Sequence, residues 1–201
     1  MSESDEDLFE RMRKGDESAF LQLYQRHRDP TFRFAYRMLG SAEQAEDVTH
    51  DCFLSLIRNP HHFDPRRGSL RNYLYGAARN LSHKRLRRPG NGLADQEYSS
   101  AAPGNGKEEP LGHLLAEELS SKVRQALTRI PPLQREIVVL SEYEEQSLED
   151  IASILGVPIG TVKSRLFRGR ECLRRELAPY LNGAGGGQIA KSGQKEKSDH
   201  E

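Results

Sequence analysis

Two stretches with helical periodicity, divided by a segment that cannot pack, constrain this chain more than any other feature. Apolar residues recur at helical spacing over roughly 7–88 and 113–181, whereas the segment between them is rich in Pro, Gly, Asn, Ser and acidic residues. Such a composition cannot bury enough apolar surface to become ordered. We therefore predict an all-α fold of two small helical domains joined by a flexible linker, with the boundaries 1–88, 89–112 (linker), 113–182 and 183–201 (disordered tail).

The first domain is predicted to be a set of short helices with polar caps. Helical spacing runs from Leu8 to Tyr24 and is interrupted at Lys14–Asp16, where a new N-cap is expected. Further helices are predicted over Thr31–Leu39, which Gly40 ends, over Ser41 to about Arg58, and over Leu70 to about Leu86 after a Ser69 cap.

The second domain carries the most specific pattern in the chain. After predicted helices around Leu114–Arg129 and Leu133–Tyr143, a short helix over Ser147–Leu155 is followed by a tight turn and a longer helix over Ile159–Leu177. Gly156 supplies a left-handed turn residue, and the small Ala152 allows the two helices to cross. The pattern predicts a helix-turn-helix.

The outer side of the longer helix predicts contact with DNA. Cations and an aromatic ring can reach base edges in the major groove, and a hydroxyl beside helix N-terminal amides suits a phosphate. The ordinary alternative is a solvated basic face, but cap, turn and small residue all agree on one geometry. The residues predicted to contact DNA are Thr161, Lys163, Ser164, Arg165, Phe167 and Arg168.

Positive charge in the first domain is concentrated in one loop and one helix, with no acidic residue between 66 and 88. Aromatic residues are interleaved with the cations, which suits unstacked single-stranded bases as well as phosphates. For Tyr73 core packing is the favoured role. The cations are Arg66, Arg67, Arg71, Arg79, Lys84, Arg85, Arg87 and Arg88, and the aromatic residues predicted to accompany them on DNA are Phe63 and Tyr75.

The preceding helix shows the opposite charge. With Ala45, Val48, Cys52 and Leu56 facing the core, its outer face is predicted to carry acids bordered by large apolar side chains, which is typical of a protein-binding surface. Such a face would repel DNA, so two partners are expected on different sides of the domain. The outer residues are Glu43, Asp47, His50 and Asp51, and the apolar border is Phe53, Leu54 and Ile57.

Composition limits the other classes of function. Lys plus Arg and Asp plus Glu both number 30, so a uniformly basic nucleic-acid binder is excluded. Two cysteines without metal-ligand spacing predict neither a disulfide scaffold nor a zinc site. No apolar run is long enough to cross a membrane, so we expect a cytoplasmic protein without direct membrane insertion.

An enzyme is an alternative, because His50, Cys52, His61, His62 and Asp64 are close in sequence. Helical phase turns Cys52 and His50 to opposite sides, however, and no phosphate-binding glycine loop, HExxH motif or carboxylate pair at useful spacing occurs. We expect no catalytic residue, no metal and no cofactor.

The order of these parts resembles the extracytoplasmic-function (ECF) sigma factors, which are bacterial transcription initiation factors. The resemblance covers nearly the whole chain except the predicted linker and tail. The strings that carry it are GDESAF (15–20), AEDVTHDCF (45–53), FDPRRGSLR (63–71), AARNL (77–81), IPPLQRE (130–136) and IASILGVPIGTVKSRL (151–166).

The resemblance implies partners and roles for individual residues. It implies that core RNA polymerase binds through its β′ clamp helices to Asp47, His50, Asp51 and Leu54, and that an anti-sigma factor is a partner. It implies that the 61–69 loop and the following helix open the minus-10 element of promoter DNA, with Asn80 at the base pocket. Lys163, Ser164, Phe167 and Arg168 fall at positions that contact minus-35 bases.

Two residues depart from the family pattern. Tyr73 stands where many members have Trp. His50 stands where Gln is common, and this departure concerns one polymerase contact.

A stand-alone helix-turn-helix repressor or activator is an alternative function that uses the same motif. Such a protein would bind an operator as a dimer, but no dimerisation seam or effector pocket is visible in the sequence.

Overall fold

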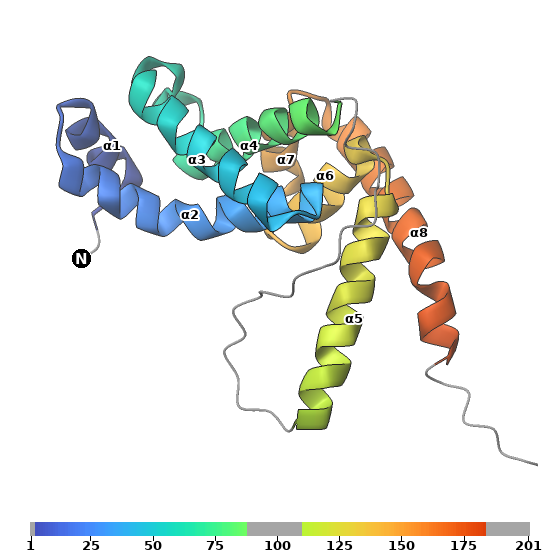
Figure 1. The fold of residues 1–201 in the computed structure, drawn as a ribbon. Helices are drawn as coiled ribbons and strands as arrows, with labels where there is room; N and C mark the ends of the chain where they lie inside the picture. Colours follow the sequence, from blue (N-terminus) through green and yellow to red (C-terminus); the bar gives the residue numbers. More distant parts are fainter. Residues whose placement is uncertain (1–2, 88–109, 184–201) are drawn as a thin grey trace, which may run out of the picture.

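A computed structural model of the chain describes residues 3–87 and 110–183, with side chains described over 3–87 and 120–180. All regular structure in these ranges is helical, as predicted for the all-α class (Figure 1). The predicted linker and tail lie outside the described residues, except for 110–112 and 183, which belong to helices. The α-helices are α1 (Asp5–Arg13), α2 (Glu17–Leu39), α3 (Ala42–Arg58), α4 (Leu70–Leu86), α5 (Pro110–Arg129), α6 (Pro132–Glu142), α7 (Leu148–Leu155) and α8 (Ile159–Gly183), and the 3-10 turns η1 (Pro60–His62) and η2 (Pro65–Arg67) precede α4.

The helices begin where capping side chains predicted them. Asp16, Ser41, Ser69 and Ser147 each accept a hydrogen bond from a backbone amide in the first turn of the helix that follows. These bonds satisfy donors that would otherwise have no intrahelical partner. The predicted starts of α2, α3, α4 and α7 are therefore confirmed.

One predicted boundary is wrong. The sequence predicted separate helices on either side of Pro30, but α2 runs without a break from Glu17 to Leu39. Proline removes one backbone donor and crowds the preceding turn, which costs about 3 kcal/mol in an isolated helix. Here α2 packs against α1, α3 and α4, and its buried residues lie on both sides of the proline, among them Leu23 and Phe34. Tertiary packing outweighs the local preference.

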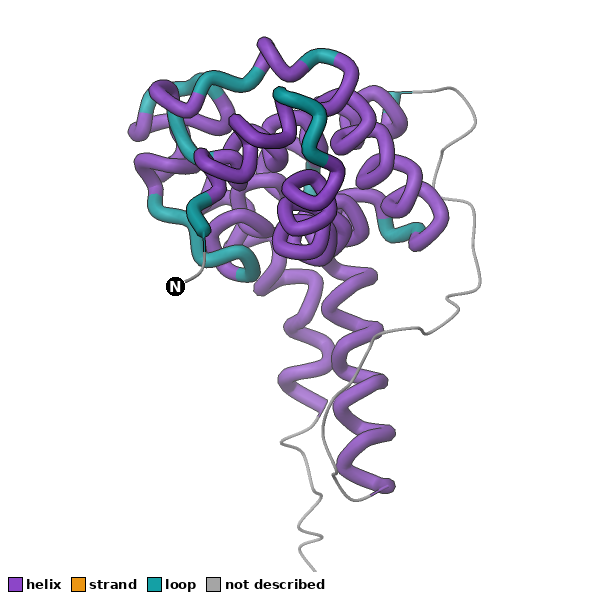
Figure 2. The backbone as a smooth tube through the Cα atoms, turned by 90° about the vertical axis from the view of Figure 1, so that its left-hand side faces the viewer, coloured by secondary structure: helices purple, strands orange, loops and turns teal. Residues whose placement is uncertain are grey.

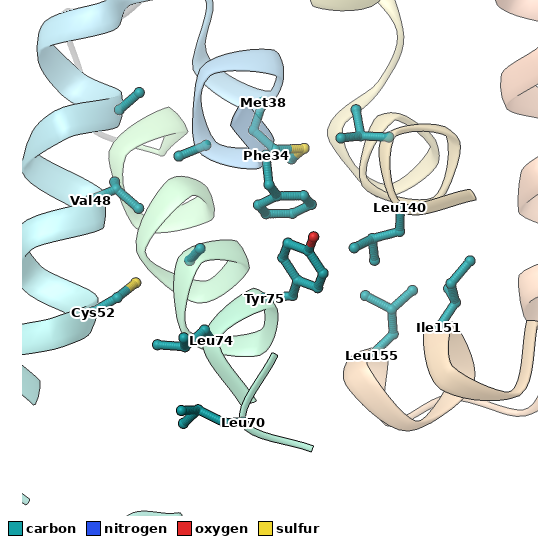
Figure 3. Packing of buried hydrophobic residues seen from close by; sticks show 14 of the residues in the cluster. Phe34, Met38, Val48, Cys52, Leu70, Leu74, Tyr75, Leu140, Ile151 and Leu155 are labelled. Carbon is teal, nitrogen blue, oxygen red and sulfur yellow. The ribbon is translucent and has the colours of Figure 1, made fainter. Parts of the chain in front are cut away.

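The buried core is continuous between the two halves of the chain. Figure 3 shows Phe34 and Met38 of α2 facing Tyr75 of α4, with Leu140 of α6 and Leu155 of α7 to their right. All five side chains are buried. Within the described residues, α2 contacts α5 and α6, and α4 contacts α7. The two predicted domains therefore lie directly against each other.

A buried arginine also connects the halves. Arg135 of α6 donates to the backbone carbonyl oxygens of Met38, at the end of α2, and of Thr128 and Ile130, at the end of α5. Helix C-termini present carbonyl oxygens that lack intrahelical donors, and a cation is favourable there. Arg135 of α6 thus joins the C-terminal ends of two helices, α2 and α5.

The helices α5 and α8 lie side by side and extend away from the rest of the molecule (Figures 1 and 2). Arg129 of α5 pairs with Glu176 of α8 at 3.0 Å, and the ammonium group of Lys122 lies 5.1 Å from the centroid of the Tyr180 ring. Among the described helices, none combines the length and apolar character that a membrane span requires.

Candidate nucleic-acid interfaces

The helix-turn-helix is formed by α7, a three-residue turn and α8. Ser147 caps α7, and Gly156 ends it with a φ of 64°, a left-handed conformation that favours glycine. Val162 of α8 and Ile151 of α7 are fully buried, which holds the two helices at a fixed crossing. The predicted motif is present, and its geometry leaves one side of α8 facing solvent.

That solvent-facing side carries the residues predicted to read DNA. Phe167 is 67% exposed, and a large aromatic side chain is seldom exposed to this extent. Lys163, Ser164 and Arg168 are also exposed, whereas Thr161 and Arg165 are half-buried at the edges of the face. The side of α8 that carries these residues is therefore accessible in its first half. Contact of the cations and the aromatic ring with base edges in a DNA groove would need such an accessible face.

The 61–69 loop and α4 form the cationic surface of the first half. Asp64 accepts from the backbone amide of Arg66 and Ser69 accepts from that of Asn72, so that two local caps shape the loop. A cavity of about 440 Å³ is lined by residues of the loop and of α4, together with Ser153 and Ile154 of α7. The predicted residues that are exposed on this surface are Arg66, Arg67, Arg71, Asn80 and Lys84.

Two aromatic residues predicted to accompany the cations are buried instead. The Phe63 ring packs edge-on against Phe9 of α1, with 4.8 Å between centroids, and also contacts Tyr73. Tyr75 is 1% exposed and donates a hydrogen bond from its hydroxyl to Glu144 at 2.8 Å. Burial raises the pKa of the Tyr75 hydroxyl. Neither ring can stack on a base in this arrangement, because each is covered by another part of the chain.

Arg79 is only partly accessible as well. Its guanidinium lies 2.8 Å from Glu136 of α6, and the His83 ring nitrogen lies 2.6 Å from the same carboxylate. Glu136 is fully buried. Neither Glu136 nor Glu144 is predictable as a partner of these residues, because no local pattern shows that either acid pairs with a residue more than fifty positions away.

The predicted acidic face is present on α3. Glu43, Asp47, His50, Asp51 and Leu54 are all exposed. Ala45, Val48, Cys52 and Leu56 face the core, as their spacing predicted. Ile57 is 47% exposed and keeps an apolar border beside the acids, which suits contact with another protein.

Phe53 does not belong to that border. The sequence predicted it at the surface, but it is 2% exposed and packs against Phe20 and Tyr24 of α2. The buried stripe of α3 is wider than the core spacing alone implies, because α2 presents two aromatic rings on that side.

The acidic and cationic regions meet at one edge of the domain. Arg85 of α4 lies 3.0 Å from the Asp47 carboxylate and 3.2 Å from that of Asp51. Because α3 and α4 are in contact, the end of the cationic helix adjoins the acidic face. Within the described residues, no group of three or more His, Cys, Asp or Glu side chains is placed to hold a metal ion.

Fold and site together define an all-helical protein with a helix-turn-helix and an exposed acidic face on α3. Residues 23–91 match the model of Sigma-70 region 2, and residues 120–173 match that of Sigma-70, region 4.

Relatives of similar length support the match. The ECF RNA polymerase sigma factor SigW of Bacillus subtilis is 32% identical over 179 residues, covering 83% of this chain and 92% of that protein. The RNA polymerase sigma-H factor of Pseudomonas aeruginosa is 32% identical over 192 residues, covering 90% and 98%. The chain therefore belongs to the ECF family of RNA polymerase sigma factors.

Solved structures agree on the fold. The sigma factor RpoE from Bartonella quintana, determined in complex with the anti-sigma factor NepR, superposes with a TM-score of 0.63 and 24% identity, covering 79% of this chain and 96% of that one. CnrH, determined in complex with the cytosolic domain of CnrY, gives a TM-score of 0.63 and 24% identity, covering 92% and 100%.

Proposed function

We propose that this chain binds core RNA polymerase and directs it to promoters, where it takes part in DNA melting and the initiation of transcription. The acidic face of α3 is the docking surface for the β′ clamp helices of the polymerase. Support comes from the exposure of Asp47, Asp51 and Leu54 together, since acids beside accessible apolar side chains are suited to a protein partner.

The two DNA surfaces divide the promoter between them. The 61–69 loop and α4 bind the minus-10 element through Arg66, Arg67, Arg71, Lys84 and Asn80. The exposed side of α8 reads the minus-35 element. There Lys163, Ser164, Phe167 and Arg168 contact bases, while Thr161 and Arg165 contact the backbone.

The observation that carries this proposal is the solvent-facing side of α8, where Phe167 stays largely exposed among cations in a correctly capped helix-turn-helix. The test is to titrate a pool of promoter fragments with the chain alone and with the chain plus core polymerase. Tight, sequence-selective binding is expected only when polymerase is present. Equally tight binding by the chain alone, as a dimer, would favour a stand-alone repressor or activator.

An anti-sigma factor is proposed as a further partner. Its support is that the sigma factor RpoE, which has this fold, was determined in complex with the anti-sigma factor NepR. Purifying the chain under native conditions from its own cells and identifying co-purifying proteins tests this. Recovery of a protein that blocks polymerase binding is expected, and recovery of polymerase alone would contradict it.

A further inference from the structure

The 61–69 loop has a single buried anchor. Phe63 is 7% exposed, and it is the only buried residue within 61–69, a range that the structure describes in full. Other contacts that shape the loop are local, such as the hydrogen bond from the Arg66 amide to the Asp64 carboxylate. The position of the loop on the domain therefore depends on what the Phe63 ring contacts.

Two aromatic rings contact Phe63. Tyr73, at 5.4 Å between ring centroids, belongs to α4 and so to the proposed minus-10 surface itself. Phe9, at 4.8 Å with the ring planes at 86°, belongs to α1, which lies outside both proposed DNA surfaces. An edge-to-face arrangement is a favourable geometry for two aromatic rings. Phe9 thus supports the loop from outside the site.

The helix that carries Phe9 is fixed on α2. Leu8 and Phe9 of α1 are both fully buried. The carboxylate of Asp5, in the first turn of α1, lies 3.0 Å from the Arg26 guanidinium and 2.6 Å from a ring nitrogen of His27, both on α2. Because packing and paired polar groups hold α1 in place, the Phe9 ring has a defined position.

Phe63 connects that position to the cavity beside the loop. Phe63, Tyr73 and Asn80 are among the residues that line this cavity. Asn80 is exposed and is one of the residues proposed to bind the minus-10 element. A shift of the Phe63 ring would therefore change the wall of a cavity within the proposed minus-10 site.

We propose that Phe9 is a positioning residue for minus-10 recognition: its ring holds Phe63, and thereby the 61–69 loop, in the conformation that receives minus-10 DNA. Phe9 itself touches no nucleotide, because its side chain is fully buried. The inference rests on the proposed function in one respect, namely that the loop binds promoter DNA. The anchoring of the loop is a property of the free chain.

The first experiment measures the anchoring without DNA, by hydrogen exchange of the free chain. Phe9→Leu keeps a buried apolar side chain and removes the pair of rings. Four loop amides are hydrogen-bonded to nearby acceptors and report local opening. They are expected to exchange about twofold to tenfold faster in the variant, which corresponds to the loss of one aromatic pair, while amides of α3 keep their wild-type rates. The four amides belong to His62, Phe63, Arg66 and Arg67.

Leu8→Ala is the matched control for this experiment. It also shortens a fully buried side chain of α1, but one that projects about 100° away from Phe9 around the helix. We expect it to lower the urea midpoint and to leave the exchange of the loop amides as in the wild type. Unchanged loop exchange in Phe9→Leu overturns the proposal. Equal acceleration in Leu8→Ala also overturns it, because the loop would then respond to any loosening of α1.

The second experiment measures recognition with the holoenzyme. Core polymerase with the Phe9→Leu chain is titrated with single-stranded oligonucleotides that carry either the minus-10 sequence of a selected promoter or the same sequence changed at one base. The preference for the matched oligonucleotide is expected to fall by about twofold to tenfold. Binding to core polymerase and to a duplex minus-35 fragment is expected to be unchanged, and Leu8→Ala should keep the wild-type preference.

The ratio of the two affinities distinguishes positioning from stability. A purely structural contribution of Phe9 would lower the amount of folded chain and leave that ratio unchanged, so an unaltered preference in Phe9→Leu contradicts the proposal. If the wild-type holoenzyme binds neither oligonucleotide, the proposed function fails, and the anchoring of the loop by Phe9 is still decided by hydrogen exchange.

Discussion

The guanidinium of Arg85 on α4 lies 3.0 Å from the carboxylate of Asp47 on α3, so the cationic helix and the acidic face share an edge. The side chain of Asp47 remains 58% exposed despite this pair. Exposed ion pairs contribute little to stability, so Asp47 is available for a partner.

Asp47→Arg is therefore expected to abolish binding to core polymerase while leaving the chain folded. The substitution reverses the charge at the centre of the docking face and places a cation beside Arg85. Co-elution with core polymerase in size-exclusion chromatography measures the effect. Asp29→Arg on α2, also a strongly exposed acid, should co-elute as the wild type does. Holoenzyme formation by Asp47→Arg would refute the assignment of the acidic face.

Arg168→Ala is expected to cost about 1–3 kcal/mol in discrimination at one minus-35 base pair, since a cation that donates to a base edge contributes that much. Competition between promoter fragments that differ at single positions measures it with holoenzyme. Arg174→Ala removes an exposed cation further along α8 and should leave the preference unchanged. An unaltered preference in Arg168→Ala would remove this residue from the reading set.

Gly169→Ala is expected to destabilise the second half by about 1–3 kcal/mol, because overpacking a filled core has that cost. An added Cβ would lie 2.5 Å from Val138 Cγ2 on α6, and Val138 is fully buried. Gly160→Ala in the same helix meets no atom within 4 Å and should be neutral or stabilising by up to about 1 kcal/mol. Urea unfolding followed by circular dichroism compares them, and equal midpoints would contradict the close approach.

Stability is expected to fall as pH drops below about 6.5, the usual pKa of histidine, in part because of His27. Burial lowers the pKa of this ring, and Arg71 and Arg26 act in the same direction, whereas the hydrogen-bonded Asp5 at 2.6 Å opposes them. A lowered pKa means that the folded chain binds fewer protons than the unfolded chain, so acid favours unfolding. His27→Gln should show a smaller loss of urea midpoint between about pH 7.5 and about pH 5.5. An identical loss in both proteins would exclude His27 as a source.

Local chemistry predicted the parts of the fold that depend on neighbours in sequence. The Asp16 and Ser147 caps, the left-handed Gly156 and the core spacing of α3 are all present, because each is decided within one or two turns of helix. The exposed side of α8 was predictable for the same reason, since helical phase alone separates the exposed Phe167 from the buried Val162.

Features decided by distant segments were not predictable in this way. Pro30 stays inside α2 because five other helices pack on that helix, and Phe53 is buried because α2 supplies aromatic partners. The burial of Tyr75 depends on Glu144, which lies 69 residues away. No periodicity within α4 indicates that a second domain covers it.

The most direct test of the central claim is transcription in vitro from a promoter library, using core polymerase with and without this chain. The account predicts new transcripts that begin downstream of shared minus-35 and minus-10 sequences, appear only when the chain is added, and are lost with Asp47→Arg. The absence of chain-dependent transcripts, together with no association between the chain and core polymerase, would contradict it.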